Sequence, residues 1–224
     1  MTEWNTLFLT FKLAFVTTCL LLVIAIPLAY WLTVSSLKIK PVIEAFISMP
    51  LVLPPTVLGF YLLMLYSPSG FPGRWLHTYL GMRLAFSFEG LVLASVIYSL
   101  PYIVQPVQAG FAAVPDNLRD AARIMGKSGW EILLHVYIPT GRISIITGSM
   151  LAFAHTIGEF GVVLMVGGSI PGKTRTASIA VYEAVELMDY SLANHYALIL
   201  TGSSFLILMI VFLLKGTNLF RFER

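Results

Sequence analysis

Two groups of residues in this chain have types and spacings that could do chemistry. The segment 167–174 reads GGSIPGKT, which matches the pattern G-x-x-x-x-G-K-[ST] of phosphate-binding loops. His155 and Glu159 place an imidazole and a carboxylate four residues apart, the spacing of neighbours on one face of a helix. The first group would bind a nucleotide through backbone amides, and the second would move a proton or hold a metal ion.

The rest of the chain supports neither chemistry. A phosphate-binding loop follows a strand of a parallel sheet, for which this chain has no room, and the nearest acidic candidate, Asp189, lies in the same loop. The His155–Glu159 pair has no nucleophile or third metal ligand in sight, and the single Cys19 allows no disulfide within the chain. We therefore expect no catalytic residue, no metal and no cofactor in this chain. Lys173 and Arg175 stay candidates for attracting an anion or contacting an acidic partner.

The elements that must position these residues are membrane helices. Hydrophobic residues make up 58% of the 224 and charged residues 11%, with a mean hydropathy of +0.85. About 20 apolar residues cross a bilayer as a helix. The charge-free or nearly charge-free runs predict five spans: 13–34, 43–66, 89–110, 143–166 and 194–214. The sequence indicates an all-α polytopic membrane protein with a single domain over 1–224, and the segment 167–190 leaves a sixth, short or re-entrant segment open.

The distribution of the basic residues predicts which side of the membrane each loop faces. They are scattered, with no stripe and no interleaved aromatic residues, so we expect no nucleic acid partner. With five spans the loops alternate sides. One side carries nine basic residues: Lys38, Lys40, Arg119, Arg123, Lys127, Arg142, Lys215, Arg221 and Arg224. The other side carries five: Lys12, Arg74, Arg83, Lys173 and Arg175. The positive-inside rule then predicts an N-terminus outside and a C-terminus in the cytoplasm.

Two features inside the predicted spans suggest a pathway or a gate. Pro50, Pro54 and Pro55 fall within one apolar stretch, where each removes a backbone donor, so the second span should kink or break. In a membrane, freed carbonyls are tolerated only where protein or a water-filled cavity covers them. Glu159 at the end of the fourth span is a carboxylate at membrane depth. We expect it to act in gating or packing, since a negative charge disfavours an anion path.

The segment 111–142, called the polar loop below, is a charged island between apolar spans. Asp116 is a good helix N-cap, and Gly126 ends the helix that follows. Leu118, Ala121, Ala122 and Met125 share one face of this helix, which either packs back onto the spans or meets another protein. The segment 128–131, SGWE, has the pattern of a capping box and starts a second short helix, which Pro139 should stop.

The polar loop resembles the EAA motif of the permease subunits of ABC importers, EAA-x3-G-x9-I-x-LP. Asp120, Ala121, Ala122 and Gly126 match its first half, and the segment 136–139, VYIP, matches its second half with conservative departures. Further segments, 50–59 (PLVLPPTVLG), 155–161 (HTIGEFG) and 170–176 (IPGKTRT), are similar to those of the molybdate permeases of that family. The resemblance covers nearly the whole chain.

The resemblance implies a type I ABC importer fold in the bacterial inner membrane, with the chain as a homodimeric pathway through the lipid bilayer. Two cytoplasmic ATP-binding subunits would hold ATP and Mg²⁺, each receiving the helix that includes Leu118, Asp120 and Met125. A periplasmic oxyanion-binding protein would deliver the substrate. Molybdate, tungstate and sulfate or thiosulfate stay open as cargo. An ATP-independent secondary transporter is the alternative from another class, and five spans without a buried charge relay argue against it.

Overall fold

The computed structural model describes residues 2–67, 70–71, 73–81 and 83–216. Arg221 and Arg224, which contribute to the charge bias, lie outside the described residues. The described residues form helices without any strand, in agreement with the expected all-α class. The helices are α1 (Thr2–Val34), α2 (Lys40–Ser48), η1 (Met49–Leu51), α3 (Pro55–Tyr66), α4 (Gly73–Leu80), α5 (Phe88–Ala112), α6 (Asp116–Ile124), α7 (Gly129–Ile132), η2 (Leu133–Tyr137), α8 (Ile138–Thr140), α9 (Arg142–Gly158), α10 (Gly161–Gly167), α11 (Ala177–Glu186) and α12 (Tyr190–Gly216).

Among the described residues, three helices are long and apolar enough to cross a membrane alone: Glu3–Val34 in α1, Phe88–Ala112 in α5 and Tyr190–Leu213 in α12. Two more spans exist if each of two bent helix pairs counts as one. The first span is longer than expected, because α1 begins at Thr2 and not near residue 13. At 1.5 Å per residue the 32 residues Glu3–Val34 measure about 48 Å, so α1 either tilts or projects beyond about 30 Å of hydrocarbon.

The second span is broken, as the three prolines predict. The segments Lys40–Leu51 and Pro55–Tyr66 meet at 108°. Pro54 lies at φ −55° and ψ 134°, outside the helical region, because the ring of Pro55 disfavours a helical conformation in the residue before it. The fourth span is also bent, by 60° between α9 and α10, with Glu159 in the extended conformation at the junction. No proline lies near this second break, so no local signal predicted it.

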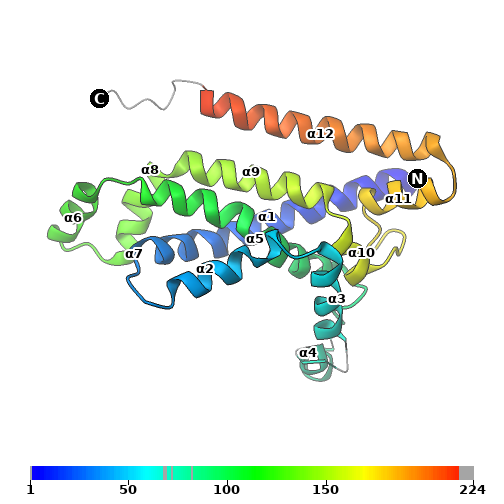
Figure 1. Ribbon diagram of the computed structural model, residues 1–224, viewed down its shortest axis with the longest axis horizontal. Coiled ribbons are helices and arrows are strands. Elements are labelled where there is room, and N and C mark those ends of the chain that lie inside the picture. Colours follow the sequence, from blue (N-terminus) through cyan, green and yellow to red (C-terminus); the bar gives the residue numbers. More distant parts are fainter. Residues whose placement is uncertain (1, 68–69, 72, 82, 217–224) are drawn as a thin grey trace.

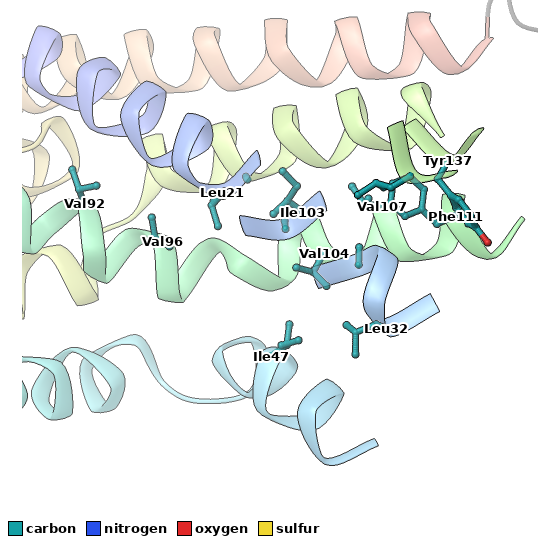
Figure 2. Packing of buried hydrophobic residues seen from close by; sticks show 14 of the residues in the cluster. Leu21, Leu32, Ile47, Val92, Val96, Ile103, Val104, Val107, Phe111 and Tyr137 are labelled. Carbon is teal, nitrogen blue, oxygen red and sulfur yellow. The ribbon is translucent and has the colours of Figure 1, made fainter. Parts of the chain in front are cut away.

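The core surrounds α5, which packs against α1 and α9 (Figure 1). Figure 2 shows Leu21 of α1 with Val96 and Ile103 of α5 among the buried residues of this cluster. By contrast, α12 lies along the outside of α9, and Phe205 and Phe212 are 65% and 69% exposed. An apolar helix with an open apolar face suits a lipid environment. Its exposed side chains are therefore those expected of a membrane-spanning helix.

Candidate functional site

The polar loop stands at one end of the bundle, where α6 projects beyond the long helices (Figure 1). No residue of α6 is buried. The helix ends where the Gly126 amide bonds to the Arg123 carbonyl at 2.9 Å and the Lys127 amide to the Ala122 carbonyl at 3.1 Å. Gly126 has φ +73°, the left-handed conformation that glycine adopts without steric cost. The expected helix with a glycine turn is therefore present.

The N-cap prediction for Asp116 is wrong by one residue. The cap position is Pro115, which makes no side-chain cap, and Asp116 is the first residue of α6. The Asp116 carboxylate instead forms an ion pair with the Arg119 guanidinium at 2.9 Å, one turn on. Proline suits the start of a helix because the first backbone amides have no partner within the helix. The acidic side chain still favours this end through the helix dipole.

The second half of the polar loop starts with the predicted capping box. The Ser128 hydroxyl accepts from the Glu131 amide, and the Glu131 carboxylate accepts from the Ser128 amide at 2.8 Å. This amide, then the Lys127 ammonium and the Ser128 hydroxyl, lower the pKa of Glu131 to about 2. A fully ionised Glu131 at neutral pH therefore closes the turn between α6 and α7.

The prediction that Pro139 stops this helix before the next span is confirmed to within one residue. The chain continues from α7 through the π-helix η2 and α8 to Thr140. A π turn is the wider arrangement that accommodates a residue lacking its amide hydrogen. Within η2 the ring of Tyr137 is 3% exposed and makes edge-to-face contacts with Tyr30 of α1 at 4.9 Å and Phe111 of α5 at 5.4 Å. Together with Ile132 and Leu133, which are also buried in the core, Tyr137 attaches the polar loop to the bundle (Figure 2).

The tip of the polar loop presents uncovered apolar side chains among charges. Leu118 is 46% exposed and Met125 75%, so most of the predicted helical face is open. Ala121 is exposed as well, whereas Ala122 packs partly against the core. Ile124, which is not among the residues predicted from the sequence, is 88% exposed. A large apolar residue at the end of so polar a helix was the signal that could have identified it. This face is suited to contact another protein.

Asp120 is paired within its own helix. Its carboxylate lies 3.2 Å from the Arg119 Nε and 3.9 Å from the Arg123 Nη1. The hydrogen bond to Asp120, with the nearby Asp116 carboxylate, raises the pKa of Arg119. These exposed pairs orient the side chains and add little stability. Any bond from Asp120 to a partner protein would compete with the two arginines.

A second candidate site lies where the two broken spans meet. The Cβ of an alanine at position 59 would lie 2.7 Å from the Met165 Cβ, and at position 161 it would lie 2.7 Å from the Pro55 Cβ. Glycine therefore lets α3 and α10 approach each other closely. Beside this contact is a cavity of about 510 Å³, called the break pocket below. Its lining includes Pro55, Thr56, Tyr98, His155, Glu159 and Phe160.

Glu159 is held at the break pocket by two serines. It is 5% exposed, and its Oε2 accepts a hydrogen bond from Ser95 of α5 at 2.9 Å. The hydroxyl of Ser178, in α11, donates to the backbone carbonyl of Glu159. The other carboxylate oxygen of Glu159, Oε1, is buried without a hydrogen-bond partner among the described residues. Glu159 therefore joins the broken fourth span to α5 and α11 at the point where it bends.

His155 occupies the same pocket but does not work with Glu159. Its Nδ1 lies 3.0 Å from the Ser99 hydroxyl, and its ring stacks on Tyr102 with centroids 3.9 Å apart. The ring of Tyr98 lies 4.8 Å away on centroids. Within the part of the chain that the structure describes, no hydrogen bond joins His155 to Glu159, and no group of three His, Cys, Asp or Glu residues could hold a metal. The pair is arranged for packing.

The remaining predicted pathway residues separate into three places. Pro55 lines the break pocket, while Pro50 is buried in η1 and Pro54 is exposed at the break. Lys173 lines a different cavity. Arg175 forms an ion pair with Glu183, with its Nε 2.8 Å from the carboxylate. Thus Pro55 and Glu159 share a site, and the two basic residues do not join it.

The segment 167–174 does not fold as a phosphate-binding loop. The amides of Lys173, Thr174 and Arg175 all point to the Ile170 carbonyl, at 2.9–3.1 Å. The Thr174 hydroxyl donates to the Gly167 carbonyl at 2.7 Å and accepts from the Ile170 amide. A phosphate site needs these amides free to converge on an anion. The loop satisfies them internally, so the sequence match carries no nucleotide site.

Comparison with known proteins identifies the chain's relatives. Residues 6–221 match the family model described as binding-protein-dependent transport system inner membrane component. The chain is 46% identical over 205 residues to the molybdenum transport system permease protein ModB of Azotobacter vinelandii, covering 91% of this chain and 90% of that protein. It is 33% identical to ModB of Escherichia coli strain K12, covering 82% of this chain and 80% of that protein. A sulfate transport system permease protein, CysT of Synechocystis, is 32% identical and covers 79% of this chain and 61% of that protein.

Solved structures share the fold. The chain matches a chain of a bacterial ABC transporter involved in the import of alginate with a TM-score of 0.76 at 12% identity, covering 100% of this chain and 81% of that one. It matches the MetNI methionine ABC transporter in an inward-facing conformation with a TM-score of 0.72 at 15% identity, covering 94% of each chain. The helices, the breaks and the projecting loop are therefore a type I ABC importer permease fold.

Proposed function

Because the chain belongs to the family of binding-protein-dependent transport system inner membrane components, we propose that it is the permease subunit of an ATP-driven importer of molybdate. Identity of 46% to a molybdenum transport permease over most of the chain supports this cargo. The sulfate permease relatives favour a second cargo, a similar tetrahedral dianion such as sulfate, thiosulfate or tungstate. As a multi-pass membrane subunit, the chain supplies the pathway and not the hydrolytic site.

The observation that carries the proposal is the polar loop, an ordered helix–turn–helix whose apolar tip is uncovered. Ile124 and Met125 are 88% and 75% exposed at the end of α6, outside the apolar bundle. A separate cytoplasmic subunit that binds ATP and Mg²⁺ would receive this tip in a groove. Its closure on ATP would move α6, and Tyr137 would pass the movement to α1 and α5. Two permease copies and two ATP-binding subunits would form the complete importer.

The break pocket is the part of the pathway that such a movement would change. The two broken spans meet there through glycines, so a small rotation of α9 would alter how α3 and α10 contact each other. Glu159 and its serine partners would hold one of the two arrangements. A periplasmic binding protein would deliver the oxyanion at the other end of the bundle, with the N-terminus outside and the C-terminus in the cytoplasm.

The test is uptake of labelled molybdate by cells that lack their own high-affinity system and express the chain with its ATP-binding subunit and binding protein. We expect uptake that stops when the ATP-binding subunit carries an inactivating substitution, with competition by tungstate and sulfate showing the order of preference. Uptake that persists without active ATPase would indicate the alternative, a secondary transporter. Uptake of sulfate without molybdate would reassign the cargo.

A further inference from the structure

A second cavity, the one that Lys173 lines, lies at the end of the bundle opposite the polar loop. It has a volume of about 680 Å³ and is called the Arg83–Lys173 pocket below. Its walls are the end of α3, the segment just before α5, and the loop that follows α10. The α5 helix begins beside this pocket and ends next to α6. Its 25 residues place about 37 Å between the pocket and the polar loop. Nothing in the transport mechanism described above uses this cavity.

The charges at this pocket are of one sign. Arg83 and Lys173 both line it, and none of its other lining residues is acidic. Among the described residues, no carboxylate forms an ion pair with either side chain. The neighbouring Arg175, by contrast, is neutralised by Glu183. Two unpaired cations at a concave surface attract and retain anions more strongly than cations on an open surface.

A buried hydroxyl supplies the second, independent observation. Tyr66, the last residue of α3, is 6% exposed and lines the pocket. Its hydroxyl has no hydrogen-bond partner among the described residues. Buried polar groups are nearly always satisfied, so an orphaned hydroxyl at a cavity wall indicates a missing acceptor. An anion oxygen is the acceptor that two neighbouring cations would bring to this wall.

The pocket is built on a constrained backbone. Phe86, which also lines it, has φ +59°, an unusual conformation for a residue with a bulky side chain. The Phe86 amide donates to the Val166 carbonyl of α10 at 2.9 Å, which fixes this wall to the broken fourth span. Backbone strain of this kind persists only where the surroundings hold it, and it is concentrated at functional sites.

We propose that the Arg83–Lys173 pocket binds a small tetrahedral dianion, with both cations balancing its charge and the Tyr66 hydroxyl donating a hydrogen bond to one of its oxygens. The inference rests on the proposed function, since molybdate is the dianion that the importer would receive at this end. The cavity is larger than the ion, so water accompanies it. The pocket holds the released oxyanion between the binding protein and the closed pathway.

The test measures binding without the binding protein. The permease with its ATP-binding subunit is placed in discs of phosphatidylcholine, and labelled molybdate is titrated by equilibrium dialysis. We expect saturable binding that Arg83→Gln and Lys173→Gln each weaken about tenfold or more, because charged hydrogen bonds are lost. Tyr66→Phe keeps the ring and should weaken binding by about twofold to tenfold. Lys12→Gln is the matched control, since its ammonium lies over the Phe88 ring, 4.7 Å from the centroid, and does not line the pocket.

The outcomes separate this proposal from the transport function. Two results would overturn the pocket and leave the importer function intact. In the first, the wild-type complex takes up molybdate but binds none without the binding protein. In the second, none of the three pocket variants changes molybdate binding. Loss of binding-protein affinity in Arg83→Gln and Lys173→Gln, with molybdate binding unchanged, would also overturn it and assign the cations to a protein contact. Discs that contain phosphatidylglycerol test whether a lipid phosphate is the ligand of the pocket. If molybdate binding is abolished in these discs, the lipid phosphate occupies the pocket in place of molybdate, and the proposal is overturned.

Discussion

At the scale of single residues, Glu159 combines burial, an orphaned oxygen and a position at a bend. Among the described residues its one side-chain hydrogen bond comes from Ser95, so the acceptor at Oε2 links the end of α9 to α5. We expect Glu159→Gln to keep uptake close to wild type, because the amide oxygen still accepts from Ser95. Ser95→Ala and Glu159→Ala should each lower stability by about 1–3 kcal/mol, since each leaves a buried group unsatisfied. Thermal unfolding of the solubilised complex, with uptake in parallel, measures both effects. A Glu159→Gln complex as inactive as Glu159→Ala would mean that the negative charge itself is required.

Glu131 has a pKa that its local hydrogen bonds determine. Its pKa is lowered to about 2, chiefly by the Ser128 amide, then by the Lys127 ammonium. A depressed pKa in the folded state means that the capping box contributes stability above the unfolded value near 4.5, and loses it as the pH falls through about 2. We therefore expect ATPase coupling to show no titration of Glu131 between pH 5 and 8. Carbon NMR of labelled carboxyl groups should place the midpoint of Glu131 far below 4.5. A midpoint near 4.5 would show that the box is open in solution.

At the scale of elements, the glycine turn after α6 is where the proposed docking role of the polar loop can be tested. Gly126 has φ +73°, and a Cβ added there meets nothing within 4 Å. Gly126→Asp therefore costs about 1–2 kcal/mol from the left-handed backbone alone and adds a charge beside Ile124 and Met125. We expect the variant to insert normally but to lose binding-protein-stimulated ATPase activity and uptake. Co-purification with the ATP-binding subunit measures the docking directly.

Gly81 provides the control for this substitution. It has φ +64°, also with nothing within 4 Å of an added Cβ, and it lies after α4, away from the polar loop. Gly81→Asp has the same backbone cost and the same new charge, so it should still co-purify with the ATP-binding subunit. If the Gly81 variant lost the ATP-binding subunit as the Gly126 variant does, or the Gly126 variant kept it, the assignment of α6 as the docking helix would be wrong.

The contact between the two broken spans should be equally sensitive to one methyl group. An alanine at position 161 would bring its Cβ to 2.7 Å from the Pro55 Cβ, closer than real contacts allow, and Pro55 cannot rotate away. We expect Gly161→Ala to destabilise the complex by about 1–3 kcal/mol through overpacking and to slow uptake. Gly202→Ala in α12, where an added Cβ meets nothing within 4 Å, should change neither the melting temperature nor uptake. Unchanged melting of the Gly161 variant would show that α3 and α10 are free to separate.

How far the elements follow from the sequence depends on whether the signal is local. Three prolines predicted the first break and SGWE predicted the capping box, because each acts within one helical turn. The bend at Glu159 depends on Ser95 and Ser178, distant residues that no local pattern reveals. The helix of Pro139 ends at Thr140 as expected, but the π turn before it, where Tyr137 packs against α1 and α5, has no local signal. Tertiary contacts decided the cases in which local patterns failed.

At the scale of the whole molecule, the described chain has more apolar surface than its own core can cover. Phe46 and Val52 on the broken second span are 67% and 85% exposed, and they flank a cavity of about 600 Å³. Lipid suits such a surface on α12, but α2 and α3 turn by 108° and cannot present a straight lipid-facing wall. A second copy of the chain is the partner that the proposed homodimer would bring to this face.

The arrangement of charges across the molecule predicts its orientation. Lys38, Lys40, Arg119 and Lys127 lie on the elements near α6, whereas Lys173 and Arg175 lie in the loop between α10 and α11, at the other end in Figure 1. Because more basic residues belong to the α6 end, that end should face the cytoplasm.

Cysteine labelling tests this orientation in a chain whose Cys19 is replaced by serine. Leu187 follows α11 and is 80% exposed, so Leu187→Cys should react with an impermeant maleimide on intact cells. Ser36→Cys, exposed in the loop after α1, should react only after the membrane is opened. The reverse labelling pattern would place α6 where no ATP-binding subunit could reach it and would contradict both the orientation and the docking role of the polar loop.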